Sequence, residues 1–169
     1  MKRTFFPLAL LSAVATLTAQ TKMTAREAAV KIADRILAST TYEFKNTKTG
    51  EIYKSVKKLP LDMDVKVACK YNNWHYTNGV TNMALMELGD KLGDKKYEKY
   101  VLKNMNFVFN EGNLDFFRKQ YDEAFKRDGW NAVRKLSWHM IFRGKRLDDN
   151  GPMGASLIEL QLKYPNDSF

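Results

Sequence analysis

Two adjacent carboxylates, Asp148 and Asp149, stand directly before a helical pattern near the end of the sequence. Met153, Leu157 and Leu160 recur at helical spacing and predict a helix that buries one side. The free N–H groups of a first helical turn attract acidic side chains, so both acids are expected at an N-terminal end. One acid suffices for a helix cap, whereas a second is typical of the rim of a polar pocket. Both interpretations stay open at this point.

An aromatic cluster, Trp74, His75 and Tyr76, precedes a second apolar stretch in the same way. If both stretches are helices, the two clusters are expected at one end of the same bundle. Aromatic rings with a polar tip suit stacking on sugar rings, although they also suit plain core packing. His75 has no second ligand at metal spacing, so a structural or surface role is favoured over catalysis.

A second aromatic and histidine pair, Trp138 and His139, lies four residues before Arg143. On a helix, His139 and Arg143 would share one face and together could bind a carboxylate. A solvated face at a helix end is the alternative. No His-x-x-x-His or Glu-x-x-His spacing, Gly-rich phosphate loop or Gly-x-Ser-x-Gly elbow occurs, so no metal and no cofactor are expected.

The first 19 of the 169 residues are typical of a secretory signal peptide, with a basic start, an apolar stretch and small residues before Gln20. No cysteine stands at the expected cleavage site, so no lipid anchor is predicted, and a periplasmic or secreted location is expected. Residues 20–169 fit one domain. Cys69 is the sole cysteine, which excludes an intrachain disulfide.

The chain is strongly basic, with 28 Lys and Arg against 19 Asp and Glu and a formal charge of +9. A basic exported domain favours an anionic partner such as a polysaccharide, a nucleic acid or a membrane surface. Nucleic acid is disfavoured because the lysines spread along helix faces and no basic and aromatic motif of a known binding module occurs.

The pattern along the chain predicts a nearly all-α fold. A capping box at Thr24–Glu27 starts a first helix, and residues 41–73 fit either a small hairpin or an ordered loop. An unusually apolar helix, expected in the interior, ends at Gly93. Further helices are predicted from Asp94 as a cap to Gly112, over 113–129, over 130–142, and from about Gly151 to Tyr164 with Asp149 or Asn150 as the cap.

Three motifs stand out by their order and spacing. They are Trp74-His75-Tyr76-Thr77-Asn78-Gly79-Val80, Gly93-Asp94-Lys95-Lys96-Tyr97 and Leu147-Asp148-Asp149-Asn150-Gly151-Pro152-Met153-Gly154-Ala155. Together they resemble the amino-terminal part of glycoside hydrolase family 105, the unsaturated rhamnogalacturonyl hydrolases, and the related family 88, the unsaturated glucuronyl hydrolases. The resemblance covers roughly residues 24–169.

This resemblance implies an (α/α)6 barrel with alternating inner and outer helices, of which residues 20–169 would form about half. The family removes a Δ4,5-unsaturated uronic acid from the non-reducing end of pectin-derived rhamnogalacturonan oligosaccharides. An Asp protonates the vinyl ether, water adds, and the resulting hemiketal collapses. The ordinary geometry of two glycosidase carboxylates therefore need not apply.

The resemblance also assigns roles to residues. Asp149, with Asp148 as the alternative, matches the first of two active-site acids, while the principal general acid is expected beyond Phe169. Trp74 and Tyr76 match the aromatic positions before the first inner helix and are expected to stack on the sugar. Besides these matches, the expected substrate-binding residues are Asn78, Trp138, His139 and Arg143, of which the last two would meet the uronate carboxylate.

Two other functions remain open on the sequence alone. One is a different helical-barrel glycosidase or lyase that acts on another anionic glycan. The other is a non-catalytic helical module that binds a glycan or a protein through its aromatic residues.

Overall fold

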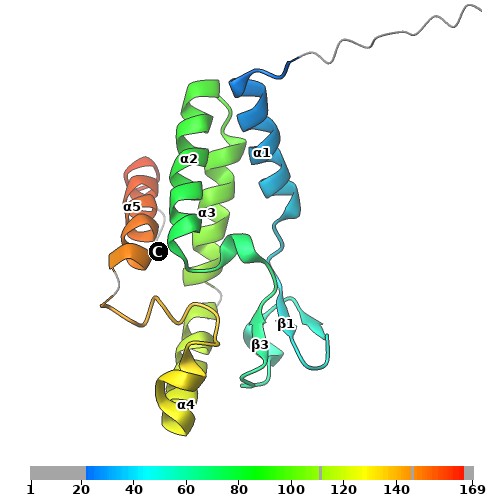
Figure 1. Ribbon diagram of the computed structural model, residues 1–169, viewed down its shortest axis with the longest axis vertical. Coiled ribbons are helices and arrows are strands. Elements are labelled where there is room, and N and C mark those ends of the chain that lie inside the picture. The colour runs from blue at the N-terminus through cyan, green and yellow to red at the C-terminus, as the bar shows by residue number, and fades with distance from the viewer. Residues whose placement is uncertain (1–21, 111, 146, 166–169) are drawn as a thin grey trace, which may run out of the picture.

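The computed structural model describes residues 22–110, 112–145 and 147–165, with the backbone alone for Asp149. The expected signal peptide, residues 1–19, lies outside the described residues. The described chain is mostly helical with one small antiparallel sheet. In Figure 1 the helices α1, α2, α3 and α5 occupy the upper part of the molecule, and the sheet and α4 lie below them.

The first helix, α1 (Ala25–Ser39), begins at the predicted capping box. The Thr24 side chain accepts the Glu27 backbone N–H at 3.2 Å, and the Glu27 carboxylate accepts the Thr24 backbone N–H at 2.8 Å. These two hydrogen bonds each give a partner to a backbone N–H group that has none within the helix. This part of the prediction is confirmed.

The segment between α1 and the next helix contains a small sheet, so the hairpin interpretation is confirmed, and the described chain is mostly helical, as the nearly all-α expectation has it. Its strands are β1 (Phe44–Asn46), β2 (Ile52–Tyr53) and β3 (Val65–Val67), in the order β2-β1-β3 and antiparallel throughout. Alternate residues of β1 are buried, as the period of a strand requires. Two short 3₁₀ helices, η1 (Val56–Lys58) and η2 (Lys70–Asn72), complete the segment.

Helix α2 (Tyr76–Leu92) ends at Gly93, whose φ of 65° is left-handed and suits a residue without a side chain. Helix α3 (Lys96–Phe109) follows, and the two helices pack together. Asp94 was expected to be the cap of α3, but Lys95 occupies that position and makes no side-chain cap bond. The Asp94 carboxylate still accepts the Lys96 backbone N–H at 3.0 Å, so it serves the helix start from one residue earlier.

Helix α4 (Asn113–Val133) is broken at Asp128 and Gly129, where the predicted helix end lies. The helix predicted over 130–142 is wrong beyond Val133, since turns and bends cover residues 134–142. The physical reason is visible at Trp138, whose φ of 54° is left-handed and interrupts a helix. That backbone places a 1% exposed indole ring against Phe107 and Phe117 in the core.

Helix α5 (Leu147–Lys163) begins four residues before the predicted Gly151, so Asn150 and Pro152 lie inside the helix instead of at its start. Both acids, Asp148 and Asp149, are thus in its first turn. Helix α5 packs along α2, and the two run in the same direction. Near their starts Gly79 meets Pro152, and at their ends the Lys163 ammonium lies 2.6 Å from an Asp90 carboxylate oxygen.

The main core lies between α2, α3, the sheet and the turns around Trp138. Its most deeply buried large side chains are Phe44, Met86, Tyr97, Met105, Phe117 and Trp138. Helix α2 was expected wholly in the interior, but it leaves Val80 54% and Met83 38% exposed. The reason is that no described element covers this face, so apolar surface stays open along α2 and α5.

Candidate functional site at the shared end of α2 and α5

A hydrogen bond joins the two sequence motifs directly. The indole N–H of Trp74 donates to the side-chain oxygen of Asn150 at 2.7 Å, across 76 positions of the chain. The Asn150 amide nitrogen in turn donates to the backbone oxygens of Met140 and Arg143, at 3.4 and 3.3 Å. Asn150 therefore does not cap α5. It ties the start of this helix to the turns before it and to the residues that precede α2.

The two helices approach each other most closely at Gly79. A Cβ atom added there would lie 2.4 Å from the backbone nitrogen of Met153 and 2.4 Å from the carbonyl carbon of Pro152. Such distances are not tolerated between carbon or nitrogen atoms, so only glycine permits this packing. The motif that contains Gly79 and the motif that contains Pro152 are therefore adjacent in space, as the sequence predicted for their clusters.

The start of α2 presents an aromatic surface. His75 is the N-cap residue, and its ring nitrogen Nδ1 accepts the Thr77 backbone N–H at 3.4 Å. The Tyr76 ring lies 4.7 Å from the His75 ring and is 47% exposed. Asp148 is also exposed, in the first turn of the neighbouring α5. Tyr76, His75 and Asp148 are thus the predicted site residues that this end offers to solvent.

Three other predicted substrate-binding residues are buried, and their polar groups stabilise the fold. Trp74 is 7% exposed and packs edge-on against Phe109, apart from its bond to Asn150. The Asn78 amide donates to the backbone oxygens of η2 and of the residue after it. Trp138 donates its indole N–H to the Asn72 oxygen at 3.0 Å. These side chains position the segments around the site and offer little surface of their own.

His139 and Arg143 do not share a helix face as expected, because their segment is built of turns. Both nevertheless contact the same side chain, Trp130. The Arg143 guanidinium lies 3.9 Å from the centre of the Trp130 ring, and the His139 ring meets that ring edge-on at 5.7 Å. His139 also approaches the Leu136 carbonyl oxygen through Nδ1 at 2.8 Å. A cation held over an indole ring is partly oriented in advance for an anionic partner.

Sequence reasoning missed one group of charged residues. Lys66 and Arg127 line a separate cavity between the sheet and α4, although they are 61 positions apart in the sequence. No motif marks them, since each is one of many dispersed cations. Among the described residues, no cluster of His, Cys, Asp or Glu side chains could hold a metal ion.

Comparison of the chain with protein-family models, with curated proteins and with solved structures gives no match. Within the described part of the chain, no helix combines the length and the apolar character that crossing a membrane requires. A functional assignment therefore rests on the residues and their geometry.

Proposed function

We propose that this chain is the amino-terminal part of a glycoside hydrolase that removes a Δ4,5-unsaturated uronic acid from pectin-derived oligosaccharides. The observation that carries the proposal is the hydrogen bond from Trp74 to Asn150. It joins two of the motifs on which the resemblance to families 105 and 88 depends. Their contact in space supports their acting as one site, at the shared end of α2 and α5.

The proposed fold is an (α/α)6 barrel, with α2 and α5 as adjacent inner helices and α3 as an outer one. The parallel course of α2 and α5 and the short connection from α2 to α3 support this arrangement. The open apolar side chains of α2 and α5, such as Val80 and Ile158, support it too. Further helix pairs would cover them, because apolar surface of this kind is normally buried in such layers.

Within this site Tyr76 stacks on the sugar ring, since it is the exposed aromatic residue at the shared end. Trp74 acts indirectly, by fixing the start of α5. Arg143, held over Trp130 with His139 beside the same ring, faces the uronate carboxylate. An Arg guanidinium recognises a carboxylate through two parallel hydrogen bonds, which orients as well as binds the substrate.

Asp149, with Asp148 as the alternative, positions the substrate or assists the protonation of the vinyl ether. Both residues lie in the first turn of α5, where free N–H groups attract acidic side chains. The principal acid that protonates the vinyl ether then belongs to another part of the barrel, beyond Phe169.

The direct test follows the ultraviolet absorbance of an unsaturated galacturonyl disaccharide. The chain would be compared with a longer version translated through any coding sequence that continues beyond Phe169. We expect loss of the absorbance band with the longer version. Loss with neither version, while the sugar still binds, would favour a non-catalytic glycan-binding module.

The acid pair provides the first mutational prediction. In the active longer enzyme, Asp149→Asn is expected to remove most of the turnover with little change in thermal stability, because residue 149 lies in the first turn of α5 and asparagine keeps the shape of aspartate. Asp148→Asn is the matched comparison, and the more damaging of the two changes identifies the assisting acid. Normal turnover in both variants would contradict the assignment.

A further inference from the structure

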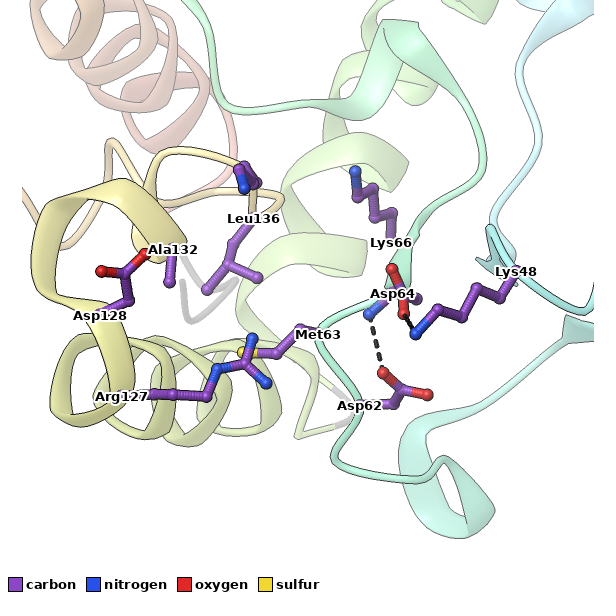
Figure 2. Close-up of a pocket in the computed structure, with 10 residues that line it drawn as sticks. Lys48, Asp62, Met63, Asp64, Lys66, Arg127, Asp128, Ala132 and Leu136 are labelled. Carbon is purple, nitrogen blue, oxygen red and sulfur yellow. Dashed lines mark hydrogen bonds and ion pairs between the residues drawn. The ribbon is translucent and has the colours of Figure 1, made fainter.

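A polar cavity of about 310 Å³ lies between the sheet and α4, and none of the site residues assigned above lines it. Residues 62–66, which lead into β3, form one wall, and residues 127–136 of α4 and the following turn form the other. Figure 2 shows Arg127 extending from α4 toward the opposite wall. The cavity falls within the volume range of small-ligand sites, about 300–1,000 Å³.

Hydrogen bonds that are buried or partly buried hold both walls in place. The fully buried Gln120 of α4 donates its amide to the backbone oxygens of Asp62 and Val65, the latter at 3.0 Å. The Val67 backbone N–H donates to the Ser137 hydroxyl at 3.0 Å. These bonds fix the sheet segment against α4 and against the turn that follows it, so the cavity is a formed feature of the fold.

Only some of the charged residues that line the cavity form ion pairs. Lys48 and Asp64 form an ion pair at 2.8 Å, shown in Figure 2, and neutralise each other. Three further cations, Lys66, Arg127 and Lys135, have no carboxylate within ion-pair distance among the described residues. Hydrogen bonding from Lys48 lowers the pKa of Asp64, and the nearby charges of Lys66 and Arg127 lower it further. With Asp62 and Asp128 included, four cations and three carboxylates line the cavity, so its formal charge is +1 and its unpaired cations favour an anion.

Two carboxylates face the same space. Asp62 accepts the Asp64 backbone N–H at 2.9 Å through Oδ1 and the Asn46 side-chain amide at 3.4 Å through Oδ2, and Asp128 stands at the break of α4. Carboxylate oxygens accept hydrogen bonds from sugar hydroxyls, but they repel a dianionic phosphate. Met63 and Leu136 add apolar surface on which the C–H face of a sugar ring can pack. Donors, acceptors and apolar surface are thus combined in one cavity.

From this combination we infer that the cavity is a second binding site for an acidic sugar, a uronate residue of an oligosaccharide. Arg127 and Lys66 bind its carboxylate, and Asp62 and Asp128 accept its hydroxyls. The inference rests on the proposed function for the choice of a uronate as the ligand. This binding site is additional to the one formed by the motifs and the acid pair. It would bind a saturated sugar residue of the same substrate chain.

The test is calorimetric titration of the chain with saturated trigalacturonate, which has no unsaturated end to cleave. Arg127→Gln is expected to weaken binding roughly ten- to a hundredfold, the range that loss of a charged hydrogen bond produces. Arg26→Gln is the matched control, because Arg26 is exposed on the distant surface of α1 and does not line the cavity. Lys66→Gln provides a second variant in case Arg127→Gln fails to fold, which circular dichroism would reveal.

Four results would overturn the inference. Equal weakening by Arg26→Gln would indicate non-specific attraction to a basic protein. Binding of neutral galactotriose with equal affinity, or tighter binding of inorganic phosphate, would indicate another ligand. Absence of binding by the unaltered chain would exclude the site. Since the probe is not a substrate for hydrolysis, the titration is independent of the absorbance assay, and either proposal can fail while the other stands.

Discussion

At the scale of single residues, the contact between the two motifs depends on one donor and one acceptor. The Trp74 indole N–H is buried, and its acceptor among the described residues is the Asn150 side chain. A buried donor without an acceptor loses its hydration and gains nothing in return. The residue types were visible in the sequence, but their pairing was not, because Asn150 was, with Asp149, one of two residues expected to cap their own helix.

Asn150→Leu is therefore expected to destabilise the chain by about 1–3 kcal/mol, since it leaves the Trp74 N–H unpaired. Adding Trp74→Phe to the Asn150→Leu chain removes the unpaired N–H and keeps an aromatic ring at position 74. The double variant should therefore recover part of the free energy of unfolding that Asn150→Leu loses. Urea unfolding of the four chains measures the coupling. Asn73→Ala, at an exposed asparagine nearby, should change little. A coupling energy near zero would show that the bond does not contribute to stability.

At the scale of helices and strands, the close contact of α2 with α5 sets the geometry of the proposed site. Gly79→Ala is expected to destabilise the chain by about 1–3 kcal/mol, because the added Cβ overlaps the backbone at Met153 and forces the helices apart. Gly154→Ala, in α5, is the matched control. A Cβ there meets nothing within 4 Å, so alanine should stabilise that helix by about 0.5–1 kcal/mol. Equal effects in thermal unfolding would contradict close packing at Gly79.

The junction of α1 with α3 gives a pH-dependent prediction. The Asp34 carboxylate lies 2.9 Å from the Lys96 ammonium and accepts the Tyr97 hydroxyl at 2.9 Å. Hydrogen bonding from Lys96, and then from Tyr97, lowers the pKa of Asp34. Because the pKa of Asp34 is lower in the folded chain than its unfolded value of about 3.9, the ionised carboxylate stabilises the folded chain at pH values above about 3.9. This contribution is lost as the pH falls through the pKa that Asp34 has in the folded chain.

Asp34→Asn should accordingly be less stable than the unaltered chain near pH 7, and the difference should shrink below about pH 4 as Asp34 itself becomes protonated. The measurement is the midpoint of urea unfolding for both chains between pH 3 and pH 7. Sodium chloride at about 1 M should reduce the part of the difference near pH 7 that comes from the exposed Lys96 pair. A difference that stays constant with pH would indicate that charge on Asp34 does not contribute.

How far the elements could be predicted depends on whether their signals are local. The capping box at Thr24 and the left-handed Gly93 act within a few residues, and both elements begin or end as expected. The helix predicted after Trp130 failed because burial of Trp138 against distant aromatic rings outweighed the helical pattern. The early start of α5 depends likewise on Asn150, whose partners lie elsewhere in the chain.

At the scale of the whole molecule, the sequence predicted the meeting of the two motifs but not the second cavity. The motifs each precede an apolar helix, so a common end of the bundle follows from simple helix packing. The cavity instead depends on how β3 lies against α4, which Gln120 determines through two backbone oxygens. A hydrogen bond from a side chain to backbone atoms far away in the chain leaves no spacing pattern in the sequence.

The open apolar surface along α1, α2 and α5 gives the last prediction. An apolar groove of about 460 Å³ separates α1 from α2, and Ile32, Val80 and Ile158 are each more than half exposed. Apolar area of this extent favours association, since each aliphatic side chain that becomes buried contributes about 1.5–3 kcal/mol. The chain by itself is therefore expected to self-associate in sedimentation equilibrium, whereas a longer chain that completes the proposed barrel should remain monomeric.

Val80→Asp locates the responsible surface, because it places a charge in the groove. It should raise the dissociation constant of the association at least about tenfold, whereas Leu61→Asp, at an apolar residue of similar exposure beside α4, should not. If both changes act equally, association arises from general surface hydrophobicity and the groove has no special role. If the chain is monomeric at all concentrations, the exposed faces of α2 and α5 need no further helices, and the barrel proposal loses that support.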